Sequence, residues 1–152
     1  MNYMFSDCTN LETIDLSSFD TKNVITMMEM FSFCKKLVNV NLSSFNTSQL
    51  TNMNNMFYSC ENLTSLDISS FDTSNVEELL KTFGNCTKLT DLNLGVFDTG
   101  KVKSKTQVFY KMPSNAIIKV KSTGAKTWIL ETIDKYDSDR PYAWNSSNVI
   151  VA

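Results

Sequence analysis

Apolar residues recur along this chain at a fixed interval of 26 residues. Cysteine marks the interval most clearly, because it occupies positions 8, 34, 60 and 86. Laying out the chain at this interval gives four matching units, numbered 1 to 4 here: residues 1–26, 27–52, 53–78 and 79–104. The aligned apolar columns include Phe5, Phe31, Phe57, Phe83 and Phe109, then Leu11, Leu37, Leu63 and Leu89, then Phe19, Phe45, Phe71 and Phe97. So many matching columns indicate an internal repeat.

Each unit has two halves with different apolar spacing. In unit 3, the segment 53–60 has apolar residues at i, i+3, i+4 and i+7, which predicts about two turns of helix. The segment 63–69 alternates apolar and polar residues, which predicts a half-buried strand. The segment 69–75 is rich in Ser, Thr, Asp and Asn, and these residues favour turns and caps.

A single unit of this kind cannot bury its own apolar face, whereas stacked units can bury their faces against one another. A degenerate unit 5 continues the pattern through Phe109 and Ile118 to about Lys121. We therefore expect an α/β repeat solenoid over residues 1–121. Its parallel sheet would lie on the concave side, and short helical turns would lie on the convex side.

The pattern changes after Lys121. Apolar residues at helical spacing begin near Thr123, a candidate N-cap, and the segment 137–141 is predicted to be a loop. A short apolar strand is expected at 148–152. Residues 122–152 are therefore predicted to form an α+β C-terminal cap of the same structural domain, with Trp128 and Trp144 covering the last unit.

Composition narrows the chemistry of the chain. It has no histidine and only four glycines, and its net charge is −2. The commonest general base is therefore missing, and so are a phosphate-binding loop and the positive charge that attracts nucleic acid. No apolar run is long enough for a membrane helix, and the first residues do not resemble a signal peptide. We expect no enzymatic activity, no cofactor, no metal, no nucleic-acid partner and no membrane insertion.

The cysteine column has two interpretations. Stacking would separate neighbouring Cys β-carbons by about the 4.8 Å strand spacing, whereas a disulfide prefers about 3.8 Å there. We therefore expect buried free thiols that pack as small apolar groups, with a disulfide as the alternative. The eight methionines are likewise predicted to fill the core.

Polar residues that alternate with the buried strand positions form the candidate ligand-binding surface. These residues are Thr13, Asp15, Asn39, Asn41, Ser65, Asp67, Asp91, Asn93 and Lys119. They are expected on the concave face of the sheet, where they could form either a ligand groove or a solvated ladder of hydrogen bonds. A cation site is a weaker alternative, because the intervening Asn residues dilute the charge. A second polar column, which contains Asp20, Asn46, Asp72 and Asp98, is predicted to form turns.

The unit spanning Met53 to Val76 has the pattern Met-x-x-Met-Phe-x-x-Cys-x-x-Leu-x-x-Leu-Asp-Ile-Ser-Ser-Phe-Asp-Thr-Ser-Asn-Val. It resembles the 26-residue repeat of BspA-like bacterial surface proteins, and the resemblance extends over residues 1–121. Unit 4 departs from the pattern at Thr82 and Gly95, which suggests drift toward the cap. The resemblance implies a cell-surface or secreted location and binding of a host or cell-surface protein or glycan, as an adhesin does.

Two functions are consistent with the repeat pattern and the resemblance. The chain is expected to be an interaction module that binds through its concave face; the alternative is a structural spacer within a longer surface protein. Because the chain begins within the repeat pattern, its first unit would expose an apolar end. A weak homodimer through that end is a further expectation.

Overall fold

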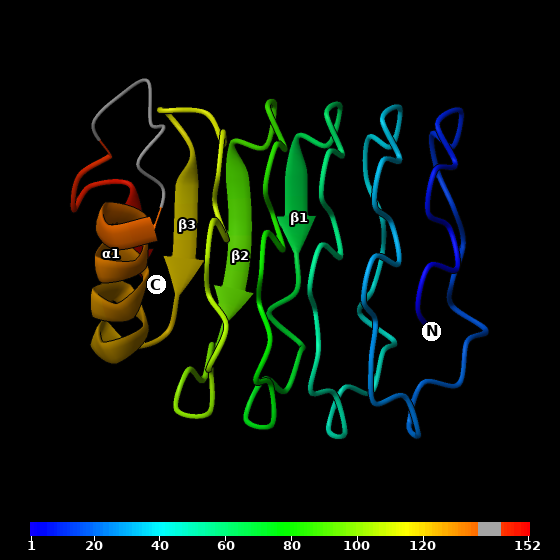
Figure 1. The fold of residues 1–152 in the computed structure, drawn as a ribbon, viewed down its shortest axis with the longest axis horizontal. Helices are drawn as coiled ribbons and strands as arrows, with labels where there is room; N and C mark the ends of the chain where they lie inside the picture. The colour runs from blue at the N-terminus through cyan, green and yellow to red at the C-terminus, as the bar shows by residue number, and fades with distance from the viewer. Residues whose placement is uncertain (137–143) are drawn as a thin grey trace.

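The computed structural model describes residues 1–136 and 144–152, which form an α/β fold with one helix and a four-stranded parallel sheet. The strands lie in the sheet in chain order. They are β1 (Ser65–Asp67), β2 (Asp91–Gly95), β3 (Ile117–Val120) and β4 (Val149–Val151). Helix α1 (Thr123–Tyr136) lies at the end of the molecule beside β3 (Figure 1). The loop predicted at 137–141 lies outside the described residues.

Residues 26 positions apart lie beside one another, as the sequence interval predicts. In the sheet, Ser65 pairs with Asp91, and Asp91 pairs with Ile117. Isolated parallel bridges with the same offset link Thr26 to Asn52, Asn52 to Glu78, and Glu78 to Ser104. Figure 1 shows the successive units side by side along the long axis of the molecule. The core is therefore a set of columns that run through all the units.

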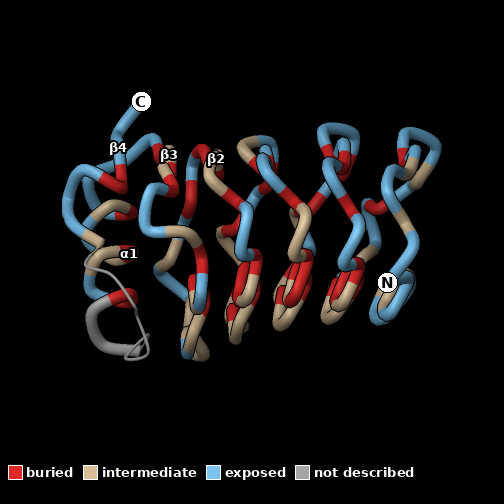
Figure 2. Tube along the Cα trace, turned by 90° about the horizontal axis from the view of Figure 1, so that it is seen from above, coloured by how far each residue is buried: buried red, intermediate tan, exposed pale blue. Residues whose placement is uncertain are grey.

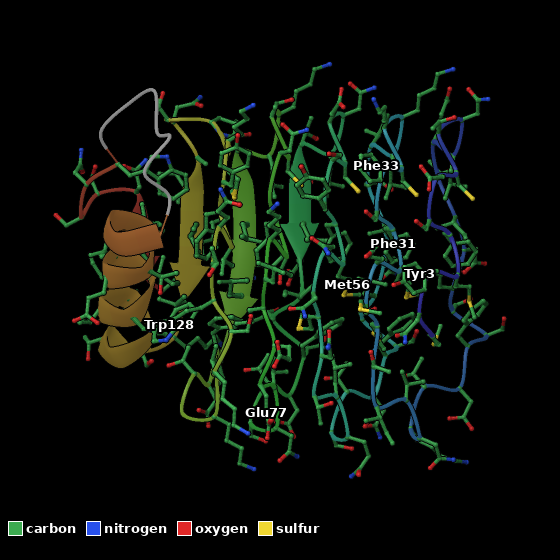
Figure 3. The ribbon with its side chains drawn as sticks, viewed as in Figure 1. Tyr3, Phe31, Phe33, Met56, Glu77 and Trp128 are labelled. Carbon is green, nitrogen blue, oxygen red and sulfur yellow. The ribbon has the colours of Figure 1, made fainter. Side chains whose placement is uncertain are left out.

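The phenylalanine column shows how this core is packed. Phe31, Phe57 and Phe83 are each 0% exposed. The ring centroid of Phe57 lies 5.5 Å from that of Phe31 and 6.1 Å from that of Phe83, with interplanar angles of 8° and 10°. Phe5 and Phe109 extend the stack at its two ends. Phe31 is labelled in Figure 3 together with Met56, another fully buried residue.

The first eight residues of each unit, which we call the bend side, are not helical, so the helical turns predicted there are wrong. The bend side comprises residues 1–8, 27–34, 53–60, 79–86 and 105–112. In unit 3, Asn55 and Ser59 have φ angles of 54° and 60°, in the left-handed region that an α-helix excludes. The same two positions are left-handed in the other units: Tyr3 and Asp7, Glu29 and Phe33, Lys81 and Asn85, and Gln107 and Lys111.

Hydrogen bonds between units explain this conformation. The backbone N–H groups of Asn55, Phe57 and Ser59 donate to carbonyl oxygens of unit 4 at 2.8, 3.0 and 2.9 Å. The intervening Met56 N–H donates back to Met53 within its own unit. A two-turn helix would gain few bonds for the cost of nucleation, whereas stacked units offer a partner at every second residue. The inward apolar positions are the same for both conformations, so the apolar spacing alone does not distinguish them.

The opposite side of each unit, which we call the strand side, is less regular than the sequence predicts. It comprises residues 11–17, 37–43, 63–69, 89–95 and 115–121. Strands form here only in units 3 to 5, and β4 of the cap extends the sheet. Units 1 and 2 have no assigned strand; among the described backbone bonds here, Val38 N–H donates to the carbonyl of Glu12.

The expected concave curvature of the strand side is therefore not observed. Regular bonds tie the units closely together along the bend side, and few such bonds exist between the strand sides of units 1, 2 and 3. The N-terminal units fan apart toward the side that carries the strands (Figure 2). The strand side of these units consequently lies on the wider side of the stack.

The C-terminal residues cover unit 5 with one helix and one strand, as predicted. Helix α1 packs against β3 and β4. The ring of Trp128 packs edge-on against that of Phe97, with 5.9 Å between the ring centroids. The helix cap is Ser122, whose Oγ accepts the N–H of Ala125 at 3.1 Å, so the predicted cap at Thr123 is wrong by one residue. The ring centroid of Trp144 lies 6.5 Å from that of Phe109.

All four thiols are free, but they are not all buried as predicted. Cys34, Cys60 and Cys86 are buried, whereas Cys8 is exposed. Each buried Sγ donates to a carbonyl oxygen of the preceding unit at 3.0–3.1 Å. Burial raises the pKa of Cys34 and Cys86 to about 12. Cys8 differs because, in the structure, its unit is the first of the stack.

Candidate functional site

The nine candidate residues all lie on the strand side, where outward positions alternate with buried ones. Thr13, Asp15, Asn39, Asn41, Ser65 and Asp67 are exposed, while Asp91, Asn93 and Lys119 are half-buried. Five of them lie in β1, β2 and β3, and the other four lie in units 1 and 2 outside any strand. We call the surface formed by these nine residues the strand surface.

The Asp and Asn column of the strand surface stabilises the chain locally. In each of units 1 to 4 the side-chain oxygen accepts the backbone N–H two residues later. Asp15 accepts from Ser17 at 2.9 Å, and Asp67 accepts from Ser69 at 2.8 Å. Asn41 accepts from both the N–H and the hydroxyl of Ser43. These are Asx turns, so this column has a structural role as well as an outward position.

Side chains at the C-terminal end of the strand surface also bond to one another across units. Asn93 Nδ2 donates to Asp67 Oδ2 at 3.2 Å. Lys119 Nζ reaches the carboxylate of Asp91 at 2.8 Å. The polar groups here satisfy one another. Among the described residues, Thr13, Asn39 and Ser65 have no such side-chain bond, so the N-terminal part of the surface has more unused bonding capacity.

A hollow on the strand surface lies between units 2 and 3, where the strand ladder is missing. Its volume is about 400 Å³. It is lined by Asn39, Val40, Asn41, Leu42, Ser43, Ser65, Asp67, Ser69 and Ser70. A smaller hollow of about 120 Å³ lies over β1, β2 and β3, beside Asp91 and Lys119. Seven of the nine candidate residues thus line two adjoining depressions, whereas Thr13 and Asp15 line neither.

Part of the lining of the larger hollow lies outside the nine candidate residues. Ser43, Ser69 and Ser70 contribute hydroxyl groups, and Val40 and Leu42 lie at its floor, where they are 8% and 1% exposed. Ser43 and Ser69 are the N–H donors of the Asx turns and belong to the serine column that runs beside the Asp and Asn column in the repeat, and Ser70 follows that column. The separation of the units has no counterpart in the repeat pattern.

Gly95 also has a role that its sequence position did not reveal. Its φ is +60°, and a Cβ there would lie 2.7 Å from the Cα and carbonyl oxygen of Ser69. The register of β2 against β3 shifts between Asn93 and Gly95. Glycine is therefore required by close packing between units 3 and 4, and the interpretation of this position as drift was wrong.

The electrostatics of the strand surface favour hydrogen bonding. Hydrogen bonds from Ser69 hold the pKa of the Asp67 carboxyl below its ordinary value, and bonds from Ser17 do the same for Asp15. Both groups are therefore carboxylates at neutral pH, able to accept bonds, while Asn39 and Asn41 offer amide donors. Within the described residues, no group of three or more His, Cys, Asp or Glu could hold a metal ion.

The second polar column forms turns as predicted, because each side-chain oxygen accepts the backbone N–H two residues later, as Asp72 does from Ser74 at 3.0 Å. A column of threonines directly after it forms a ladder between units. The buried hydroxyl of Thr47 accepts the N–H of Asp72 at 2.8 Å and donates to its carbonyl at 3.2 Å. Thr21 and Thr73 make the same pair of bonds to the next unit. These threonines stabilise the stacking of units.

These observations define an α/β protein whose 26-residue units stack through backbone ladders and present a polar surface on one side. The chain belongs to a family described as "Mycoplasma protein of unknown function, DUF285", whose model matches residues 1–120. This membership is consistent with a surface location. The search of curated proteins and the search of solved structures each returned no match. Among the described residues, no helix has the length and apolar character needed to cross a membrane.

Proposed function

We propose that the chain is a leucine-rich-repeat-type solenoid related to BspA-like proteins, and that it acts as an interaction module of a bacterial cell-surface protein. The 26-residue register of the pairings supports the repeat architecture. The family match over residues 1–120 is consistent with a surface location. A stack of this kind holds its outward side chains on a fixed frame, which lowers the cost of ordering them when a partner binds.

The observation that carries the proposal is the hollow of about 400 Å³ between units 2 and 3. It combines unused polar groups, such as Asn39 and Ser65, with a largely buried apolar floor at Val40 and Leu42. Binding sites commonly have such a mixture of apolar surface and a few placed polar groups. The partner is a protein or a glycan, because amide, hydroxyl and carboxylate groups can bond to the hydroxyls of a sugar or to a peptide backbone.

Asn39 and Ser65 are the best positions to test, because their side chains are exposed and make no hydrogen bond within the described residues. We would screen the protein against glycans and matrix proteins, and then repeat the positive assays with Asn39→Lys/Ser65→Lys. This variant should lose binding at least tenfold, since two long charged side chains would fill the hollow. Thr87→Lys, an exposed polar-to-lysine change at a corner outside the hollow, is the matched control and should bind normally.

The spacer function is the second candidate, and the bonds of Asp67 to Asn93 and of Lys119 to Asp91 favour it. A surface whose polar groups satisfy one another needs no partner. If Asn39→Lys/Ser65→Lys folds, as circular dichroism would show, and binds every screened partner as well as Thr87→Lys does, the strand surface is not the binding site. The spacer function would then be the better explanation.

A further inference from the structure

The bend side, which faces away from the strand surface, carries two lysines that lie over tyrosine rings. Lys81 Nζ lies 5.6 Å from the ring centroid of Tyr58, and Lys111 Nζ lies 5.1 Å from that of Tyr110. We call these four residues the basic strip. Lys111 is exposed, and the other three are half-buried.

The positive charges of the basic strip are not neutralised by neighbouring carboxylates. Lys35, Lys103 and Lys119 each form an ion pair. Among the described residues, neither Lys81 nor Lys111 forms one. Each ring attracts its ammonium group without cancelling the charge. The two charges therefore stay available to an anion from solution.

The first ring of the basic strip is fixed in place by its neighbours. The ring of Phe33, labelled in Figure 3, packs edge-on against that of Tyr58, with 5.4 Å between the ring centroids. On the next unit, a Cβ at Gly84 would lie only 3.1 Å from Tyr58 Cδ2, so the ring covers this glycine. Asn85 Nδ2 donates to Ser59 Oγ at 2.9 Å beside the ring. A lysine held over such a ring loses less conformational freedom when it binds an anion.

Charge is distributed unevenly along the stack. Residues 79–121 contain eight lysines and two aspartates, a net charge of +6. Residues 1–78 contain ten acidic residues and three lysines, a net charge of −7. The basic strip belongs mainly to units 4 and 5, so its surroundings attract anions, while the acidic units repel a long anionic chain that continues along the stack.

We propose that the basic strip binds a short stretch of acidic polysaccharide, with its sulfate or carboxylate groups at Lys81 and Lys111. Tyrosine rings and asparagine amides beside the lysines can contact the ring carbons and hydroxyls of a sugar, which a purely basic patch could not do. This site is separate from the strand surface and does not depend on the function proposed for it.

The composition of the basic strip favours a polysaccharide over a nucleic acid. Direct recognition of phosphates and bases commonly uses arginine, and the described part of the chain contains no arginine. Acidic residues of the bend side, Asp7 and Glu29, would also repel an extended phosphate backbone. A short acidic glycan avoids both difficulties.

The test measures binding of heparin and of polygalacturonate, a sulfated and a carboxylated polysaccharide, at physiological ionic strength. The key variant is Lys81→Gln/Lys111→Ser, because Gln107 and Ser59 occupy the same positions of other units in the same backbone conformation. It should weaken binding of at least one polysaccharide about tenfold or more. The matched control, Lys88→Gln/Lys101→Gln, removes the same charge from exposed positions outside the bend side and should change binding less than about threefold.

Further measurements separate the site from general charge attraction. Tyr58→Phe should keep binding because the ring still holds Lys81, whereas Tyr58→Ser should weaken it; thermal unfolding would confirm that both variants are folded. Equal losses in the strip and control variants would overturn the proposal, as would the absence of binding to both polysaccharides. Binding of poly-L-glutamate or single-stranded DNA as tight as that of the polysaccharides would show that the strip recognises another class of partner.

Discussion

Replacing Phe57 with alanine should be among the most destabilising changes in this protein. The ring is 0% exposed and stacks on both Phe31 and Phe83. Burying such a side chain contributes roughly 1.5–3 kcal/mol, and each aromatic contact adds about 0.5–1.5 kcal/mol. The cavity would be bounded by units held rigidly by backbone bonds on the bend side, so little collapse can offset the loss. We therefore expect the free energy of unfolding to fall by about 3–5 kcal/mol.

Urea denaturation followed by circular dichroism would measure this loss, with Phe5→Ala as the matched control. Phe5 belongs to the same column, but it is only partly buried and stacks on a single column neighbour, Phe31. Its replacement should cost about 1–2 kcal/mol. Equal losses for the two variants would mean that stacking along the column does not stabilise the fold, and the reasoning about the core would be wrong.

Three other measurements test the stacking of units. Thr47→Val leaves the N–H and carbonyl of Asp72 without their partner and should cost about 1–3 kcal/mol in urea denaturation, whereas Thr99→Val, at the end of the same column, should cost less. Thiol titration should find one rapidly reacting group, Cys8, in the native protein and four after denaturation; two or more fast thiols in folded protein would contradict the described burial. The raised pKa of Cys34 and Cys86 means that the folded protein keeps protons that the unfolded chain loses above about pH 9. Stability should therefore fall between about pH 9 and pH 12, and fall less steeply in Cys34→Ala/Cys86→Ala.

The sequence was most informative about the features that depend only on which residues face inward. The interval of 26 residues identified the columns, and inward columns such as that of Phe31, Phe57 and Phe83 are buried as expected. The helix near Thr123 and the strand near Val149 were also predictable, because their apolar patterns are local. In each of these cases one apolar pattern corresponds to one arrangement.

The bend side shows where this correspondence fails. Apolar residues at i, i+3, i+4 and i+7 fit a short helix, and they fit equally a series of turns with two left-handed residues. The choice between them depends on the hydrogen bonds that Asn55 and Ser59 make to the next unit. The first left-handed position is occupied in successive units by Tyr, Glu, Asn, Lys and Gln. Because these residue types share no preference for the left-handed region, the sequence of this column did not predict the conformation.

The outward position of the candidate residues could be predicted, but the shape of the surface that they form could not. Outward alternation correctly placed residues such as Asn39 and Ser65 on one exposed surface. A regular parallel sheet would have filled the space between units 2 and 3 with backbone bonds, and no hollow would remain. The hollow depends on the absence of those bonds, a property of two neighbouring units together that neither unit's sequence expresses.

The bend side and the strand side contribute differently to the stacking of units, and this difference has a consequence for function. Backbone bonds along the bend side and the threonine ladder, exemplified by Thr47 and Asp72, tie units 2 and 3 together, and on the strand side it is the inward side chains such as Leu42 and Leu66 that pack in the core. Substitutions at Asn39 or Ser65 therefore remove no contact on which stacking depends. Exposed side chains that make no stabilising contact, such as those of Asn39 and Ser65, can be replaced at little cost in stability. The strand side of units 2 and 3 is thus the part of this chain where new binding specificity could arise while the fold is retained.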